Sequence, residues 1–257
     1  MIHRLRDLDV LRAACGDDDL VMWTAQDLRG QARAWALGNA VVAGAPRISL
    51  HDRLAVWGDP DDPDDAVELV RHALAELGPT YRPLGERELM RRVAAGLEGV
   101  RESGAFSWMS LKAAPAAPPP EVGWLDGEAD QEVAALLAGD APTSYAVPGA
   151  PGVRRWAGVR VGHELAAVAA DAWSAPSVGL LAGVATAARF RGRGLAERVC
   201  GWGSSQLVAT HGRAALMVDD VNTAAIKVYE RIGYRRRPVL ACQVTGPDPA
   251  GVQMMAR

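Results

Sequence analysis

The feature that most constrains the fold is an apolar run that leads through a glycine- and arginine-rich turn into a helical pattern. Residues 177–186 contain no ionisable side chain, and a short run of this kind favours a strand buried on both faces. The turn that follows reads Arg191-Gly192-Arg193-Gly194-Leu195-Ala196, and a helix is predicted over residues 194–210. A strand, a tight turn and a helix in this order are typical of an α/β fold.

The turn has the features of a phosphate-binding site. The first backbone N–H groups of a helix have no partner within the helix and carry partial positive charge, so they attract anions. Gly192 and Gly194 lack a Cβ, which allows a tight bend and a close approach of a phosphate. Arg189, Arg191 and Arg193 add positive charge.

Other phosphate motifs fit this turn less well. A Walker A turn needs Gly-Lys-Ser/Thr, which the sequence lacks. A dinucleotide-binding fingerprint needs a third glycine where Glu197 stands, although Asp219 and Asp220 lie roughly 20 residues further on, where that motif places an acidic residue. A dinucleotide site and a plain surface loop therefore stay open as alternatives.

A second motif lies further along the chain. Residues 222–234 read Asn-Thr-Ala-Ala-Ile-Lys-Val-Tyr-Glu-Arg-Ile-Gly-Tyr. With residues 191–196, which match the pattern R/Q-x-x-G-x-G/A, this run resembles the GNAT superfamily of N-acetyltransferases, in which Asn, Ala, Tyr and Gly-Phe/Tyr follow in this order. The resemblance covers about residues 125–245 and implies the GNAT fold, an α/β fold with a mixed sheet.

The resemblance also implies an acyl donor, acetyl-coenzyme A, and the residues that bind it. In this family two neighbouring strands splay apart, so that backbone groups of the first strand pair with the pantetheine arm. The implied cofactor-binding residues are Val184, Ala185, Thr186, Arg191, Gly192, Arg193, Gly194, Leu195, Ala196, Glu197, Asn222 and Tyr229.

Tyr229 is the catalytic residue that the resemblance implies. In the family such a tyrosine meets the thioester sulfur and protonates the departing thiolate, and a phenol with a reference pKa of about 10 suits that task. Structural roles stay open beside these: Asn222 could cap the helix, and Tyr229 could pack in the core. We interpret Tyr234 as a packing residue.

A general base is hard to assign. An amine attacks as a neutral nitrogen, which enzymes often obtain through a carboxylate, and many family members place a glutamate on the strand before the turn. Residues 177–186 offer none, so Asp219 and Asp220 are the nearest substitutes, with capping or solvation as the alternative. We interpret His163 and Glu164 as solvated residues of a hairpin turn.

A proline-rich segment, residues 112–120, divides the chain and excludes a regular helix or central strand there. We therefore predict two domains, residues 1–120 and 121–257, with a proline-rich loop inside one domain as the alternative. The first is an α/β domain with strands at 33–38, 39–43, 53–57 and 106–111 and helices at 64–77 and 86–97. The second has helices at 130–137, 194–210 and 223–232 and strands at 154–161, 164–171, 177–186, 214–218 and 238–244.

The two halves share a rough order of elements, so the first could be a degenerate, GNAT-like duplicate of the second. Its loop after the strand at 53–57 reads Gly58-Asp59-Pro60-Asp61-Asp62, and this negative charge would repel a phosphate. If the halves are related, the first has lost cofactor binding.

Bulk composition narrows the class of partner. A formal net charge of -3 gives no sign of a nucleic-acid or membrane-surface partner. No run reaches the ~18 apolar residues of a membrane span, and the start of the chain lacks a signal-peptide pattern, so we expect a cytoplasmic protein. The wide spacing of Cys15, Cys200 and Cys242 argues against a metal site or a disulfide framework.

From the sequence we predict an N-acetyltransferase that moves an acetyl group from acetyl-coenzyme A to a primary amine of a small molecule or peptide by direct attack. We expect a monomer or a homodimer. Two alternatives stay open: a non-catalytic coenzyme-A-binding regulatory protein, which the missing base favours, and a dinucleotide-binding enzyme.

Overall fold

The computed structural model describes residues 1–114 and 121–245, which form two compact units. Unit 1 consists of Met1–Arg47, His51–Ala105 and the described residues from Val239 onward, and unit 2 of Ile48–Leu50 and Phe106–Pro238. The predicted domain boundary near residue 120 falls on residues 115–120, outside the described residues, and stays a prediction.

Unit 1 is a mixed sheet with helices. Its strand order is β1 (His3–Leu5), β2 (Arg33–Leu37), β3 (Ala40–Ile48), β4 (His51–Trp57), β5 (Tyr81–Glu86) and β12 (Arg235–Val244), and β4 and β5 are parallel. Its helices are α1 (Leu8–Ala14), α2 (Asp19–Ala25), α3 (Asp64–Leu77) and α4 (Arg87–Ala95), with a 3₁₀ turn at Gln26–Leu28 after α2.

Helix α3 has the bounds that its sequence predicts. Acidic residues in its first turn complement the helix dipole, and Gly78 ends it with a positive φ. Its buried residues Leu69, Val70 and Ala73 pack with Leu54 and Val56 of β4. This apolar contact stabilises unit 1 by about 25 cal/mol per Å² of apolar surface removed from water.

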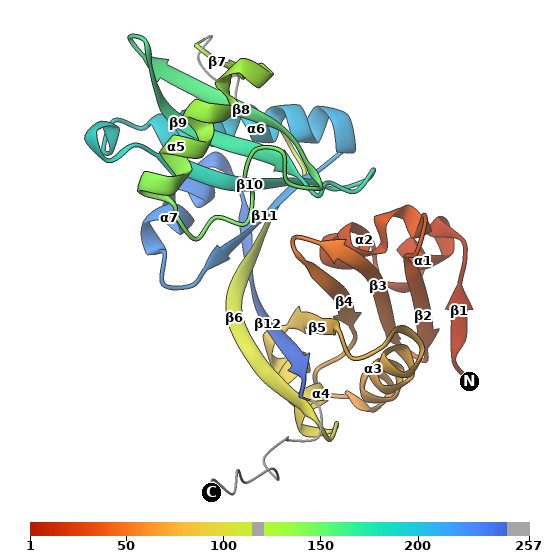
Figure 1. Ribbon diagram of the computed structural model, residues 1–257. Coiled ribbons are helices and arrows are strands. Elements are labelled where there is room, and N and C mark those ends of the chain that lie inside the picture. The colour runs from red at the N-terminus through yellow and green to blue at the C-terminus, as the bar shows by residue number, and fades with distance from the viewer. Residues whose placement is uncertain (115–120, 246–257) are drawn as a thin grey trace, which may run out of the picture. The chain divides into compact units, whose positions relative to one another are not determined.

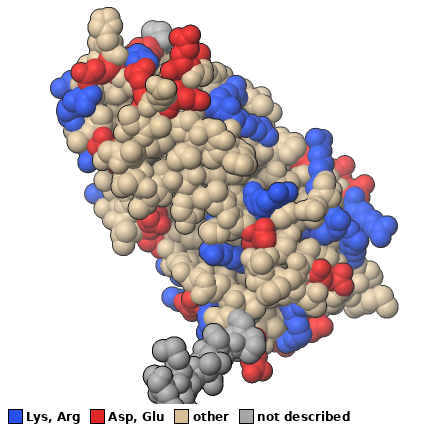
Figure 2. All heavy atoms as spheres, in the orientation of Figure 1, with Lys and Arg blue, Asp and Glu red and all other residues tan. Residues whose placement is uncertain are grey.

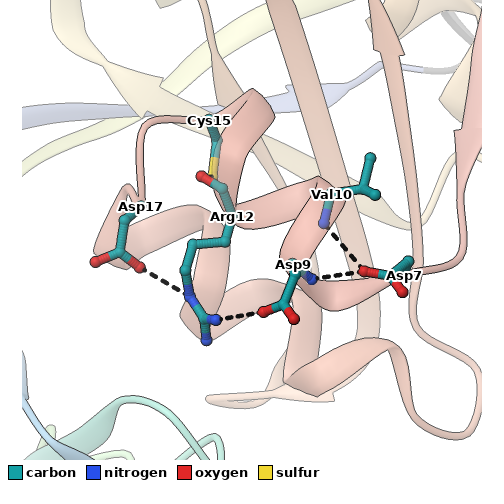
Figure 3. Close-up of polar contacts among 6 residues, drawn as sticks. All are labelled: Asp7, Asp9, Val10, Arg12, Cys15 and Asp17. Carbon is teal, nitrogen blue, oxygen red and sulfur yellow. Dashed lines mark hydrogen bonds and ion pairs between the residues drawn. The ribbon is translucent and has the colours of Figure 1, made fainter.

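Helix α1 is held by side chains close to it in sequence (Figure 3). The Asp7 carboxylate caps its first turn and accepts hydrogen bonds from the backbone N–H groups of Asp9 and Val10 at 2.8 and 3.1 Å. Arg12 forms ion pairs with Asp9 and Asp17. Cap and ion pairs stabilise a helix of 7 residues, which is too short to be stable alone.

Unit 2 contains the elements that the GNAT resemblance covers. Its strand order is β6 (Val100–Leu111), β11 (Ala214–Asp219), β10 (Gly179–Thr186), β9 (Glu164–Ala172), β8 (Val153–Val161) and β7 (Val122–Trp124). Its helices are α5 (Asp130–Asp140), α6 (Leu195–His211) and α7 (Thr223–Ile232), with 3₁₀ turns at Gly127–Ala129 and Ala188–Phe190. Strands β6 and β12 contribute residues to both units.

The helices of unit 2 cover opposite faces of its sheet (Figure 1). Leu207 of α6 lies against Gly179, where an added Cβ would be 2.7 Å from its Cβ, and α7 joins the same core through Ile226 and Tyr229. On the other face, the Trp156 ring lies against Gly183, and α5 packs there with Val133 and Leu137 buried.

The main elements predicted for residues 125–245 are confirmed, whereas the N-terminal half contains elements that the sequence analysis missed. Those are β1, α1, α2 and β5; the short β7 was missed as well. Strand β5 was missed because it contains Pro83, which has no backbone N–H and argues against an inner strand. The predicted strand at 106–111 is the end of the longer strand β6, and the helix at 86–97 ends two residues early, at Ala95.

None of the helices within the described residues is long and apolar enough to cross a membrane.

Two glycines inside α6 provide a test of its packing. A Cβ added at buried Gly201 would meet no atom within 4 Å, whereas one at Gly203 would lie 3.0 Å from Leu181 Cδ1. Because glycine destabilises a helix interior by roughly 0.5–1 kcal/mol relative to alanine, Gly201→Ala should raise the free energy of unfolding by about that amount.

Chemical denaturation measures the effect, with Gly203→Ala as the matched control that gains less because its methyl group is crowded. Equal gains from the two variants would contradict this packing of α6 on β10.

Candidate functional site

The seam between β10 and β11 is open over most of its length. These parallel strands pair only at Gly179 with Ala214 and Leu180 with Ala215, although both strands continue for at least four further residues. Beyond Leu180 the edge of β10 that faces β11 therefore has no ladder partner. Backbone groups without partners are costly to bury, so this edge is a place for a ligand that hydrogen-bonds to main chain.

A β-bulge changes the direction of the β10 backbone, and its register against β9, within this open stretch. The register against β9 shifts between Ala182 and Ala185, and the inserted Gly183 has a φ of +60°. After the bulge, Ala185 pairs with Val168, and the Ala187 N–H donates to the Ala166 carbonyl.

Along a strand, the backbone N–H and C=O groups of successive residues point alternately to one neighbouring strand and to the other. The backbone groups of Ala185 therefore face β9, whereas those of Val184 and Thr186 face the open seam. Thr186 also has a buried hydroxyl oxygen with no hydrogen-bond partner among the described residues. Of the three residues predicted to bind the pantetheine arm, the register thus favours Val184 and Thr186.

The turn before α6 depends on glycine at two positions. Gly192 and Gly194 have φ of +77° and +74°, the left-handed region that other residues enter at a cost of about 1–2 kcal/mol. At both positions an added Cβ would meet no protein atom within 4 Å, so the surface beside them is open. Leu195, Ala196 and Glu197 then form the first turn of α6, whose N–H groups are free of helical partners.

Asp140, at the end of α5, fixes this turn from the other side. Its carboxylate accepts hydrogen bonds from the backbone N–H of Ala188 at 3.0 Å and from Arg191 Nη2 at 2.9 Å. Arg191 Nε donates to the Thr186 carbonyl at 3.2 Å. The sequence analysis missed Asp140, because 51 residues separate it from Arg191 and no local pattern marks it.

The other charged side chains at the turn have different partners. Arg189 pairs with Glu164, which explains an acidic residue that was interpreted as solvated. The Arg193 guanidinium lies over the Phe190 ring, 5.3 Å from its centre, and forms no ion pair within the described part of the chain. Glu197 accepts a hydrogen bond from Arg231 of α7 at 2.8 Å and so connects the two helices. Arg193 is thus the turn arginine whose charge is left for an anion.

Helix α7 brings the second motif to the same core. The Asn222 side chain caps α7 by accepting from the Ala225 N–H at 3.1 Å, the structural role that the sequence left open.

Tyr229 is buried with 6% of its surface exposed, and its ring lies edge-on to Tyr234. Burial, with the nearby Cys200 and Tyr234, raises the pKa of Tyr229 well above its usual value. The phenol therefore stays protonated, and its raised pKa makes it a weaker acid than an exposed tyrosine.

Tyr234 is a packing residue, as the sequence analysis interpreted it. Its hydroxyl lies 2.7 Å from the Ser204 hydroxyl of α6, and the side chain is buried.

The two acidic residues after β11 differ in their environment. The Asp220 carboxylate accepts from the Ser107 hydroxyl at 2.6 Å and from Arg236 at 3.0 Å, and Arg236 Nε also donates to Ser107 at 2.7 Å. This network holds the loop before α7. The side chain of Asp219 is exposed and forms no hydrogen bond or ion pair with any other described residue. Of the two, Asp219 is the one left available for chemistry.

Unit 1 repeats the order of strand, helix, strand and helix, but its seam is closed. Strands β4 and β5 pair continuously from Asp52 with Tyr81 to Val56 with Gly85. A Cβ on Gly85 would lie 2.4 Å from the Val56 carbonyl oxygen, which shows how closely the strands approach. The loop that follows β4 carries Asp59, Asp61 and Asp62. Unit 1 therefore has neither the open strand edge nor the cationic turn of unit 2.

Metal ligation has no counterpart in residues 1–114 and 121–245, where no group of three His, Cys, Asp or Glu side chains could hold an ion. The cysteines Cys15, Cys200 and Cys242 are buried free thiols.

Comparisons with known proteins agree with this geometry. The fold is similar to that of a GCN5-related N-acetyltransferase from Kribbella flavida, with 20% identity, a TM-score of 0.56, and coverage of 93% of this chain and 96% of that chain. It is also similar to a GCN5-related N-acetyltransferase from Sphaerobacter thermophilus, with 15% identity, a TM-score of 0.54 and 96% of both chains covered. A GNAT-family acetyltransferase from Colwellia psychrerythraea matches with 14% identity, a TM-score of 0.51, and coverage of 95% of this chain and 99% of that chain.

The chain therefore has the GNAT fold, as its two motifs predict. Within it, residues 157–242, which include the open seam, the turn and all of α7, match the model of a family described as FR47-like protein. No curated protein sequence matches the chain.

The raised pKa of Tyr229 has a consequence for stability. Above the unfolded pKa of about 10, the unfolded chain releases a proton that folded Tyr229 retains, so the free energy of unfolding should fall with pH by up to ~1.4 kcal/mol per unit for this group. Below that pH the stability contributed by the neutral phenol is fully present.

Urea denaturation between pH 9 and 11 should therefore show a shallower loss of stability in Tyr229→Phe than in the wild type. An unchanged slope would mean that Tyr229 is not held neutral by burial.

Proposed function

We propose that the protein is an acyltransferase that moves an acetyl group from acetyl-coenzyme A to a primary amine. The observation that carries this proposal is the coincidence of an open strand edge with an anion-binding helix start. The edge of β10 at Val184 and Thr186 supports an extended, amide-containing arm. The turn at Gly192–Gly194, ten residues from Val184 along the chain, supports a diphosphate.

The residues present fit coenzyme A. An extended arm with amide groups matches the backbone of Val184 and the N–H group of Thr186, whose carbonyl already accepts from Arg191. The N–H groups of α6 with the Arg193 guanidinium match a diphosphate. The glycines leave the space that a Cβ would fill, and the Thr186 hydroxyl has no partner in residues 1–114 and 121–245. The bound donor would supply an activated acyl group on a thiol.

The proposed reaction needs two proton movements. The amine loses a proton to solvent or to a carboxylate, and its nitrogen then forms a bond to the acyl carbon while the carbon–sulfur bond breaks. Tyr229 gives its proton to the departing sulfur and recovers one from the nitrogen that has become positively charged. Because Tyr229 gives one proton and recovers another, it ends the reaction neutral, the form that its raised pKa favours.

The rival functions are separated by ligand and turnover. A non-catalytic regulatory protein would bind acetyl-coenzyme A without releasing thiol to any amine. A dinucleotide-binding enzyme would bind NAD instead, but here Glu197, at the place of the third glycine, is engaged with Arg231. The closed seam of unit 1 supports a single binding site per chain.

Calorimetric titration with acetyl-coenzyme A tests the first part of the proposal. We expect one equivalent to bind per chain, and Gly194→Ala to weaken binding about tenfold or more, which corresponds to 1.4 kcal/mol, because its methyl group occupies the space beside the turn.

Gly212→Ala is the matched control. It lies at the other end of α6, also has a positive φ of +81° and open space around it, and so carries similar backbone strain away from the site. Binding of NAD but not of acetyl-coenzyme A, or equal losses in the two variants, would refute the proposed donor site.

Thiol release in the presence of amines tests the catalytic part. Tyr229→Phe should lower kcat by roughly 10²- to 10⁴-fold and leave the affinity for acetyl-coenzyme A unchanged, because it removes only the proton donor. Tyr234→Phe, which keeps the neighbouring ring and loses the contact with Ser204, serves as the control with a small effect. A Tyr229→Phe variant with wild-type kcat would remove Tyr229 from the mechanism.

A further inference from the structure

The direction from which an acceptor reaches the seam follows from the placement of the helices, and this inference rests on the proposed acyl transfer. Helices α6 and α7 lie on one face of the sheet of unit 2, because both contribute to a single core cluster with Leu181 and Leu216. The other face carries α5 and residues 141–152 (Figure 1). An acceptor therefore approaches the open seam from this second face.

Residues 141–147 border the seam on the side of β10. They begin where Asp140 binds the Ala188 N–H, next to the end of β10. They then reach the bulge, where an added Cβ on Gly183 would lie 3.0 Å from the Ala146 Cβ. Ala146 is only 1% exposed and thus anchors this segment against the strand.

The two neighbours of Ala146 are exposed and hydrophobic. Tyr145 is 51% exposed and Val147 is 42% exposed. The stretch from residue 141 to residue 153 contains no Asp, Glu, Lys, Arg or His. Figure 2 shows a broad area without charged side chains on this face of unit 2. This border of the seam therefore offers exposed hydrophobic side chains and no side chain of opposite charge for an ammonium or a carboxylate.

The border on the side of β11 has one available carboxylate. Leu216 and Val218 point into the core with α6, so the alternation of the strand places Asp219 on the opposite face, where the acceptor approaches. Its side chain is exposed and has no ion pair or hydrogen bond with another described residue. The nearby acids Asp140 and Asp220 are engaged with Arg191 and Arg236.

We propose that the acceptor is an apolar primary monoamine, whose ammonium group binds Asp219 and whose apolar part lies against Tyr145 and Val147. One available carboxylate matches one ammonium group. A second ammonium or a carboxylate on the acceptor would lie against residues 141–153, where it would lose water without gaining a partner of opposite charge.

A panel of three amines with acetyl-coenzyme A tests this inference on the full-length protein. Phenethylamine is the apolar monoamine, putrescine carries a second ammonium, and phenylalanine adds a carboxylate. We expect kcat/KM for phenethylamine to exceed that for each of the others by about tenfold or more, as 1.4 kcal/mol of lost charge solvation would produce. Equal or faster turnover of putrescine or phenylalanine would overturn the inference.

Variants of Asp219 and Val147 test whether these residues cause the preference for phenethylamine. Asp219→Asn and Val147→Ser should each raise KM for phenethylamine severalfold, with the affinity for acetyl-coenzyme A unchanged. Val10→Ser, at an exposed valine of α1 in unit 1, is the control for Val147→Ser and should have no effect. Unchanged KM in both test variants would contradict the assigned acceptor surface.

Different results would reject the proposed acyl transfer and the inferred class of acceptor. Binding of acetyl-coenzyme A without thiol release to any of the amines would reject the proposed acyl transfer and this inference with it. Acyl transfer without a preference for phenethylamine would reject the inference alone.

Discussion

The candidate site depends on one interaction that the structure does not make, the pairing of β10 with β11 beyond Leu180. Two strands that start as a parallel ladder normally continue as one, because unpaired backbone groups are costly to bury. Here the bulge at Gly183 turns the chain of β10, and the seam opens. The closed ladder between β4 and β5 shows what the same order of elements gives without that bulge.

The elements around the seam hold it open by side-chain contacts. Asp140 connects the end of α5 to the turn before α6, Glu197 connects α6 to Arg231 of α7, and Asp220 holds the loop before α7 through Ser107 and Arg236. Exposed ion pairs contribute little to stability, typically about 0–1 kcal/mol each. Their main effect here is to fix the positions of the helix starts that face the seam.

Sequence reasoning succeeded where a local pattern carries the structure. The turn at residues 191–196 needs glycines for its positive φ. Helix α7 was predicted with its bounds, and Asn222 caps its start and Gly233 its end. It failed where tertiary packing overrides propensity, as for β5 with its Pro83 and for α2, which is buried from Leu20 to Ala25. The partners of the site, Asp140 and Ser107, could not be found because they are distant in sequence and belong to no motif. For unit 1 the acidic loop suggested only that cofactor binding is lost, and the closed seam between β4 and β5 was not predicted.

A crystal structure of the protein with bound coenzyme A would test the central claim most directly. The account predicts the diphosphate at the first backbone N–H groups of α6 and the pantetheine arm along the edge of β10 at Val184 and Thr186. A ligand bound elsewhere, or a seam filled by protein side chains in the presence of saturating coenzyme A, would contradict it.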